Sequence, residues 1–434
     1  MPPTSTAEPF PPPPPDRAPT PSLFRGQITL ITQGLFPFRS PAEGPSTLSG
    51  DGSLRLSHTY TGYLGVRPVD GVEMFVNPEI AAGDGVSDAR GTAGFFNGDV
   101  IRNPTLGQRP YLARYFLRWT IPTGDGVETA EEGDNVIAGP RPSERFVLTA
   151  GKVGLPDFFD TNAYANNTRT QFMNWSLLNH AAYDYAADTR GYTGGIVAEW
   201  ITPDWAVRAA TFLMPDEANG SRLAWGVRRN RGDNVEFELR PALLDDERRT
   251  VVRVTGFRNL AAMGDYRESV ALAGGGVPDI TATRRPGAAK YGGGVGFEQP
   301  LADDGATGLF ARIAASDGRK ESFAYTEAEF SFSAGAQIAG VLWGRPDDRI
   351  GLAYAQNELS PAHRDYVRAG GVGFVLGDAN FSSYAPERLF EAYYALAAWR
   401  FATITLDYQL LANPGFNADR GPASVISFRL HLVF

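Results

Sequence analysis

The chain has 434 residues, no cysteine and a formal net charge of −9. The lack of cysteine excludes disulfide bonds and thiolate metal sites, and the acidic charge argues against nucleic acid as a partner. Glycine (49 residues), phenylalanine (27) and tyrosine (17) are abundant, which suits strands joined by many turns. No apolar run is long enough for a transmembrane helix.

The first segment of the chain is rich in proline. Ten of its first 22 residues are prolines, including the run from Pro11 to Pro15. Such a segment cannot build a hydrophobic core, so we expect an extended or disordered spacer rather than a recognition motif. No signal peptide is visible at the start of the sequence. We predict two regions, the proline-rich segment 1–23 and one β-domain over 24–434.

Beyond this segment, apolar and polar side chains alternate in one stretch after another. In 54–67 the leucines face one way, and Arg55 faces the other way with serines and threonines. This period of two is typical of a β-strand with one apolar face. We predict sixteen strands, near 26–38, 53–67, 72–80, 110–122, 144–154, 193–202, 205–214, 234–241, 249–258, 290–300, 307–317, 328–343, 349–357, 386–398, 402–412 and 424–434.

The polar faces of these strands carry charged residues, and the basic ones are nearly all arginine. Lys152, Lys290 and Lys320 are the only lysines of the chain. The planar guanidinium suits a confined polar lumen, where it pairs with carboxylates and binds hydroxyl groups. For any one residue, an ion pair that only holds the wall is the alternative. The strand residues predicted to face a lumen are Arg55, Glu73, Asn77, Arg114, Arg118, Glu236, Glu238, Arg240, Glu391, Asp407 and Arg429.

The apolar faces are predicted to meet lipid. Between residues 111 and 121, Tyr111, Tyr115 and Trp119 fall on that face. Such an aromatic strip fits either a girdle at the membrane interface or a contact between subunits.

Short and long connections alternate along the chain. Short turns at one rim and long loops at the other are typical of an outer-membrane barrel. The link 123–143 is long for a turn, and 223–229 fits a strand or a loop. The short connections are 68–71, 203–204, 300–305, 345–348 and 399–400, and the long ones are 39–52, 81–109, 155–192, 215–233, 259–289, 358–385 and 413–423.

The last segment, 424–434, carries the pattern most clearly. Leu430 and its period-two neighbours form an apolar face, while Arg429 and His431 fall on the other face. Alone, this segment fits a soluble β-sandwich as well as a membrane strand. With fifteen similar segments and alternating connections, it favours an all-β fold, a transmembrane antiparallel barrel with short periplasmic turns, long extracellular loops and an aqueous channel.

The sequence carries no pattern of a known catalytic or metal site. Its four histidines, His58, His180, His363 and His431, lack the spacing of metal ligands, and no nucleophile or phosphate-binding motif is present. The acidic stretch 125–134 is better explained as solvated charge than as a calcium site. We therefore predict no enzymatic activity, no cofactor and no metal.

Nine stretches, in collinear order, carry a family resemblance: 39–49, 75–98, 148–200, 262–268, 291–305, 310–326, 343–351, 363–377 and 406–434. Among them are WGRPDDRIG and HRDYVRAGGVGFVLG. The chain resembles the carbohydrate-selective outer-membrane porins. The resemblance implies passive transport of glucose and other small sugars across a Gram-negative outer membrane. It also implies that the assembly machinery reads the terminal Phe434. The proline-rich start departs from the family, and a homotrimer is left open.

Two loops, 81–109 and 155–192, are too long to be simple connections. They hold Arg90, Asp160, Arg169, Trp175 and Arg190. We predict that one or both loops fold inward and narrow the channel with arginine and aromatic side chains. Packing over the outer rim is the structural alternative. A general-diffusion porin, or a barrel with a structural or enzymatic role, is the functional alternative.

Overall fold

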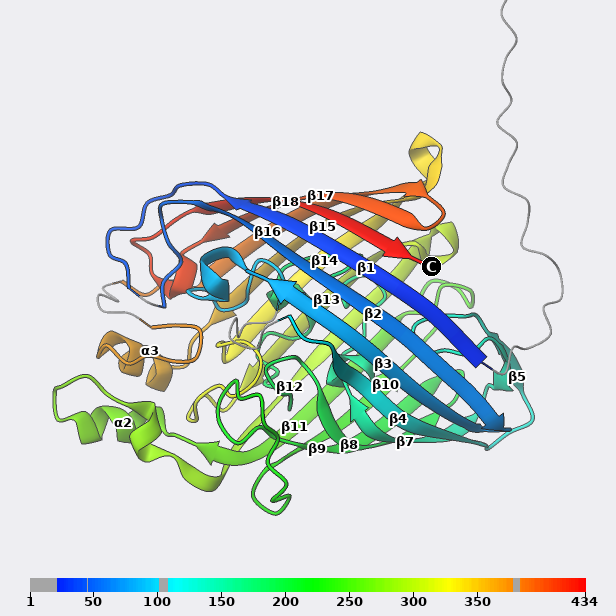
Figure 1. Ribbon diagram of the computed structural model, residues 1–434, viewed down its shortest axis with the longest axis horizontal. Coiled ribbons are helices and arrows are strands. Elements are labelled where there is room, and N and C mark those ends of the chain that lie inside the picture. The colour runs from blue at the N-terminus through cyan, green and yellow to red at the C-terminus, as the bar shows by residue number, and fades with distance from the viewer. Residues whose placement is uncertain (1–21, 45, 101–107, 378–382) are drawn as a thin grey trace, which may run out of the picture.

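The computed structural model describes residues 22–44, 46–100, 108–377 and 383–434, so the prediction for the proline-rich segment lies almost wholly outside the described residues. Sixteen antiparallel strands close into one barrel (Figure 1), and two short strands, β5 and β6, pair separately. The barrel strands are β1 Ser22–Leu35, β2 Ser53–Val69, β3 Val72–Gly83, β4 Tyr111–Pro122, β7 Arg145–Val153, β8 Thr193–Ile201, β9 Trp205–Leu213, β10 Arg231–Leu239, β11 Val251–Met263, β12 Arg285–Ala302, β13 Thr307–Ser316, β14 Phe330–Gly340, β15 Arg345–Glu358, β16 Glu387–Trp399, β17 Ala402–Ala412 and β18 Ala423–Val433.

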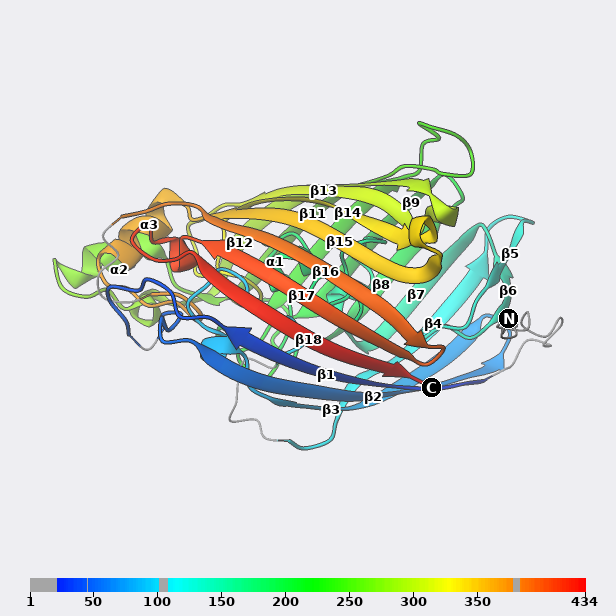
Figure 2. The ribbon, with the colours of Figure 1, turned by 90° about the horizontal axis from the view of Figure 1, so that it is seen from above.

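The first and last strands close the barrel. Leu30 of β1 lies opposite Leu430 of β18, within a register of nine paired residues. Gly26 and Phe434 exchange backbone hydrogen bonds, with N···O distances of 2.7 and 3.0 Å. Because β1 also pairs with β2, neither strand is left with a free edge. Figure 2 shows the two strands side by side.

The two faces of the wall differ as predicted. Leu406 and Phe428 point outward, with 60% and 48% of their surface exposed, whereas Arg429 and Gln409 point inward and are fully buried. An exposed apolar outer face is the condition for contact with lipid. In the described part of the chain, no helix is long and apolar enough to span a membrane.

One face assignment is wrong, at the start of β4. Asn77 pairs with Arg114 and Pro78 pairs with Leu112, so Ala113 is an extra residue. Such a bulge shifts the alternation by one position. As a result Tyr111 points into the barrel, where its hydroxyl donates a hydrogen bond to Glu79, while Tyr115 and Trp119 remain exposed outside.

The structure corrects the position of one predicted turn and decides between strand and loop for residues 223–229. The turn between β14 and β15 lies at Val341–Trp343, a 3-10 helix closed by Gly344 with φ +73°, and not at 345–348. Residues 223–229 form loop, apart from a single bridge between Pro215 and Leu223.

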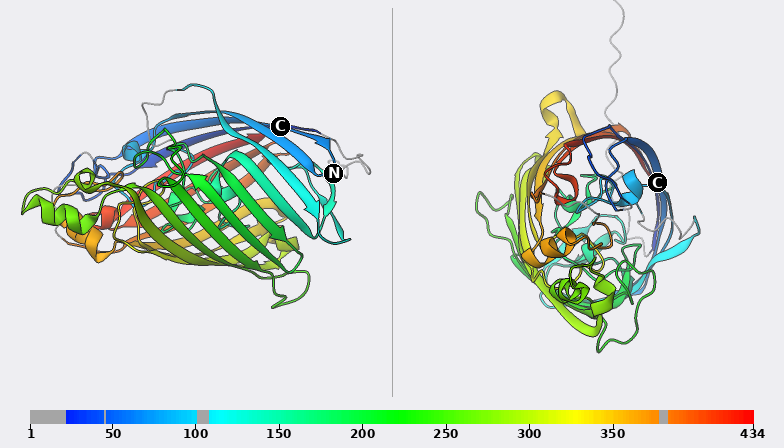
Figure 3. Two further views of the ribbon diagram at one scale, coloured as in Figure 1. Left: turned by 90° about the horizontal axis from the view of Figure 1, so that it is seen from below. Right: turned by 90° about the vertical axis from the view of Figure 1, so that its left-hand side faces the viewer.

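Short helices occupy the long connections. They include η1 Val86–Ala89, η3 Leu155–Asp157, α1 Trp175–Leu178, α2 Tyr266–Ala273, η4 Ile280–Thr283, α3 Pro361–Arg368 and η7 Pro414–Phe416. Helices α2 and α3 lie together over one rim (Figure 3), where the rings of Tyr266 and His363 stack with centroids 4.1 Å apart.

The link 123–143 is a hairpin, not a plain turn. It contains β5 Val127–Ala130 and β6 Gly139–Pro142, which pair with each other. Its inner residues Asn135 and Ile137 are buried, and the Asn77 side chain of the barrel wall donates a 2.8 Å hydrogen bond to Asn135. The inner end of the hairpin therefore lies inside the barrel.

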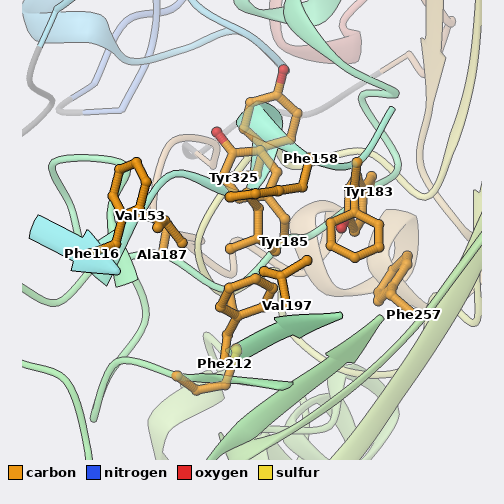
Figure 4. Close-up of a cluster of buried hydrophobic side chains, with 14 of the residues drawn as sticks. Phe116, Val153, Phe158, Tyr183, Tyr185, Ala187, Val197, Phe212, Phe257 and Tyr325 are labelled. Atoms are coloured by element: carbon orange, nitrogen blue, oxygen red, sulfur yellow. The ribbon is translucent and has the colours of Figure 1, made fainter. Parts of the chain in front are cut away.

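An apolar core fills part of the interior. Phe158, Tyr183 and Tyr185 of loop 155–192 pack against inward side chains of the wall, among them Phe212 and Phe257 (Figure 4). Aromatic packing of this kind fixes the loop against strands β8, β9 and β11.

Candidate substrate channel

Loop 155–192 is fixed to one wall of the barrel through its backbone. Arg429 of β18 donates to the carbonyls of Thr168 (2.7 Å) and Gln171 (2.8 Å). Glu391 of β16 accepts hydrogen bonds from the amides of Met173 and Asn174, the latter at 3.1 Å. Both wall side chains are fully buried, and each uses its polar atoms to hold main-chain atoms of the loop.

Strands β10 and β13 hold the same loop at Asp160. The Asp160 amide donates to Glu236 of β10 at 2.7 Å, and its carboxylate accepts from Nε of Arg312 at 3.0 Å. His180 completes this anchor, with Nε2 at 3.1 Å from the Asp160 carboxylate. Burial, opposed by the Asp160 charge, lowers the pKa of His180, so this imidazole is neutral near pH 7.

The described part of loop 81–109 also enters the barrel. Gln33 of β1 and Gln409 of β17 both donate to the Phe96 carbonyl, at 2.9 and 2.8 Å. Asn97 donates to the Ser57 hydroxyl of β2 at 2.9 Å. The described part of this loop is therefore held against the wall beside β1 and β2.

A cavity of about 810 Å³ is lined mainly by the two loops and strands β2 to β4, with the inner end of the β5–β6 hairpin at one side. Arginines, carboxylates and aromatic rings line it together. The lining side chains with this chemistry include Tyr63, Glu79, Asp99, Tyr111, Arg114, Arg118, Asp134, Asp157, Arg169, Trp175, Tyr185, Arg190 and Tyr192.

Arg169 is the centre of the ion-pair network in this cavity. Its guanidinium lies 3.0 Å from Glu79 and 2.7 Å from Asp99, and it also donates to the Thr61 hydroxyl at 2.9 Å. Burial raises the pKa of Asp99, and the Arg169 charge opposes that shift. The network ties loop 155–192 to loop 81–109 and to the wall.

Two further arginines lie on tyrosine rings of the same cavity. Arg114 pairs with both oxygens of Asp157, at 2.6 and 2.7 Å, and its guanidinium lies 5.0 Å from the Tyr192 ring centre. Arg190 lies 3.9 Å from the ring centre of Tyr111. These arrangements present flat cationic and aromatic surfaces to the cavity.

A second cavity of about 600 Å³ lies nearer the rim of the short turns. Glu73 accepts from Arg67 (2.8 Å) and Arg118 (3.2 Å) at its wall. The β5–β6 hairpin supplies Ala130, Ile137 and neighbouring residues to its lining.

A model of the carbohydrate-selective porin, OprB family matches residues 65–434. The chain belongs to this family. OprB of Pseudomonas putida in its high-pH structure has 15% identical residues and a TM-score of 0.71, over 95% of this chain and 94% of that one. The outer-membrane channel DcaP of Acinetobacter baumannii has 10% identity and a TM-score of 0.50, over 95% and 97% of the two chains. A search of curated protein sequences gives no match.

Membership in the OprB family makes this protein an outer-membrane β-barrel porin that transports carbohydrate and has no enzymatic role. Of the residues that the sequence suggested for the channel, those lining the larger cavity are Arg114, Arg118, Arg169, Trp175 and Arg190, and Glu73 lines the smaller one.

The other candidates, which lie in the wall or in the two long loops, line neither of these two cavities. Arg55 donates to a backbone carbonyl of β2, and Arg90 follows η1 as a partly buried residue. Glu238 pairs with Arg240, Arg208 and Arg253 along the wall. The remaining ones contact an inward segment or another buried wall residue: Asn77, Asp160, Glu236, Glu391, Asp407 and Arg429.

Several cavity residues were missed from the sequence. Glu79 follows Asn77 at period two, so the alternation that selected Asn77 also indicates Glu79. Tyr192 directly precedes β8, two residues after Arg190. Asp157 had no distinguishing signal, because its role depends on a contact with Arg114 from a distant strand.

Proposed function

We propose that this porin passes small neutral sugars of about the size of glucose through the larger cavity, which the two inward loops narrow. The observation that carries the proposal is that Arg169, Arg190 and Trp175 face one cavity together with carboxylates and tyrosines. Its volume of about 810 Å³ is within the range of about 300–1,000 Å³ usual for small-molecule sites.

The chemistry of a sugar matches this lining. Guanidinium groups donate to hydroxyl oxygens and carboxylates accept from hydroxyl groups, while aromatic rings contact the apolar faces of the pyranose ring. Because Glu79, Asp99 and Asp157 already pair with the arginines, each contact with sugar is weak. Weak contacts allow release, which passive conduction requires.

Conductance and flux test the proposal. Purified protein in planar bilayers should give single-channel steps that added glucose reduces. Liposome swelling should be faster with glucose and arabinose than with a charged amino acid of similar size. Equal rates for all solutes would make the protein a general-diffusion porin, and an absence of channel steps would indicate a closed, structural barrel.

We further propose that the assembly machinery of the outer membrane recognises strand β18 through Phe434. This side chain ends the closing strand and is 68% exposed. Phe434→Ala, which keeps the backbone hydrogen bonds to Gly26, should lower the amount of folded porin in the membrane without changing the conductance of the channels that insert. The sequence leaves a homotrimer open, and the exposed Tyr115 and Trp119 fit either a membrane-interface girdle or a subunit contact; cross-linking in detergent separates the two.

A further inference from the structure

The β5–β6 hairpin enters the barrel from the rim opposite to the two long inward loops. It joins β4 to β7, and the backbone pair Gly126 and Ser143 marks its base, with Ser143 N donating to Gly126 O at 2.9 Å. Val127 near the base is 70% exposed, whereas Ile137 at the inner end is 2% exposed. Asn135 and Ile137 are buried because this part of the inner end packs against the interior of the barrel.

Side chains of four wall strands hold the inner end in place. Asn77 of β3 donates to the Asn135 side chain at 2.8 Å, and Arg118 of β4 donates to the Asn135 carbonyl at 3.0 Å. Arg67 of β2 donates to the Ile137 carbonyl at 3.3 Å, and Arg25 of β1 lies 3.7 Å from Asp134. Asn135 has φ +57°, a backbone conformation that asparagine tolerates better than most residues. The hairpin is thus a fixed part of the interior.

The two cavities meet at this hairpin. Four residues line both of them: Arg118 of the wall, Val136 of the hairpin, and Asp157 and Phe158 of loop 155–192. A solute that passes from the larger cavity to the smaller one crosses between these side chains.

We propose that a second selective constriction, the neck, lies in series with the larger cavity. It is formed by Val136 and the three other shared residues, Arg118, Asp157 and Phe158. This inference rests on the proposed function, because it assumes that sugar crosses the larger cavity. Arg118 and Asp157 bind hydroxyl groups at the neck, and Val136 with Phe158 contact the apolar face of the ring. Here the hairpin, rather than a long loop, sets the size of solute that can leave.

Single cysteines test this neck directly, because the chain has no native cysteine. Val136→Cys places a thiol at the neck, and Val127→Cys places one on the exposed base of the same hairpin. A neutral benzyl methanethiosulfonate should lower the conductance of Val136→Cys by about half or more, since the added group narrows the pore. The Val127→Cys channel should be unaffected, glucose should slow the modification of Val136→Cys, and a reducing agent should restore its current.

A second variant removes the hairpin. Replacing residues 127–142 by Asn-Gly joins Gly126 to Ser143 through a tight turn. This variant should conduct more than the wild type and should admit larger oligosaccharides in liposome swelling. Migration of the folded barrel in unheated gels checks that both variants fold.

The outcomes separate the two proposals. Unchanged conductance after modification of Val136→Cys and after hairpin replacement would overturn the neck, even if glucose still reduces the wild-type current. A wild-type current that glucose does not reduce would overturn the proposed sugar channel, even if modification of Val136→Cys blocks conduction.

Discussion

Loop 155–192 contacts the barrel wall on two sides, and the two sets of contacts differ in kind. On one side, buried wall residues such as Arg429 and Glu391 bind the main chain of the loop. On the other side, the loop's own Arg169 and Arg190 face the cavity and contact side chains of the wall. The anchored side depends on buried wall side chains that bind main-chain atoms of the loop, and on the loop's Asp160 carboxylate, which Arg312 binds. The cavity side depends on the loop sequence itself, so selectivity can change while the loop stays in place.

The largest effect is expected on the anchored side. Arg429→Met keeps much of the side-chain volume but removes the hydrogen bonds to the Thr168 and Gln171 carbonyls. Each bond to a charged group contributes about 1.5–3 kcal/mol, so the loop should detach at this end. We expect a higher and noisier single-channel conductance and a loss of discrimination between glucose and a charged amino acid.

A neighbouring exchange on the outer face of β18 serves as control. Phe428→Leu keeps an apolar side chain toward lipid and should leave conductance unchanged. If Arg429→Met conducts like the wild type while the barrel is folded, the anchors do not hold the loop.

A smaller effect is expected from Arg169→Gln, on the cavity side. The change leaves Glu79 and Asp99 without their shared cation. We therefore expect loop 81–109 to be held less firmly and sugar to bind more weakly. Glucose should then reduce the current less effectively, at concentrations about tenfold higher, as expected for the loss of about 1.4 kcal/mol. A titration of the single-channel current with glucose measures this change, and an unchanged titration would place Arg169 outside the sugar path.

The stability of the folded protein is expected to depend on pH through His180, on the anchored side of the loop. Burial lowers its pKa in the folded protein, whereas the unfolded chain has a value of about 6.5. The unfolded chain therefore binds the proton more readily, so the contribution of His180 to stability is full above about pH 6.5 and is lost as the pH falls toward the lowered value. Thermal unfolding followed by circular dichroism should show this loss in the wild type. His180→Asn should show a weaker dependence on pH in the same range, and equal dependence would exclude this residue as its source.

The strands and their faces were predictable because lipid and water impose opposite demands on successive residues of each strand. The closing segment 424–434 shows this, with Phe428 outside and Arg429 inside as expected. Tyr111 was misplaced because one extra residue, Ala113, reverses the alternation, and a bulge leaves little trace in a hydropathy pattern.

The anchors could not be distinguished from cavity residues by sequence. Glu391 and Arg429 lie on the polar face of their strands, as predicted, but their partners are backbone atoms of a distant loop. Glycine 294 illustrates the same limit. A Cβ at this position would lie 2.8 Å from Nε2 of His180, so the absence of a side chain makes room for the loop.

The smallest effect is expected at Arg190, whose guanidinium lies on the ring of Tyr111. A cation–π contact contributes about 0.5–1 kcal/mol at exposed sites, so Arg190→Gln should leave folding and conductance nearly unchanged. Sugar binding should weaken only a few-fold, because one flat donor surface of the cavity is lost while Arg114 and Arg169 remain. Arg55→Gln is the matched control, since Arg55 is also an inward arginine but lines neither cavity. If both variants bind glucose with equal affinity, Arg190 takes no part in sugar recognition. The cavity side of the loop would then serve, like the anchored side, only to hold the loop in place.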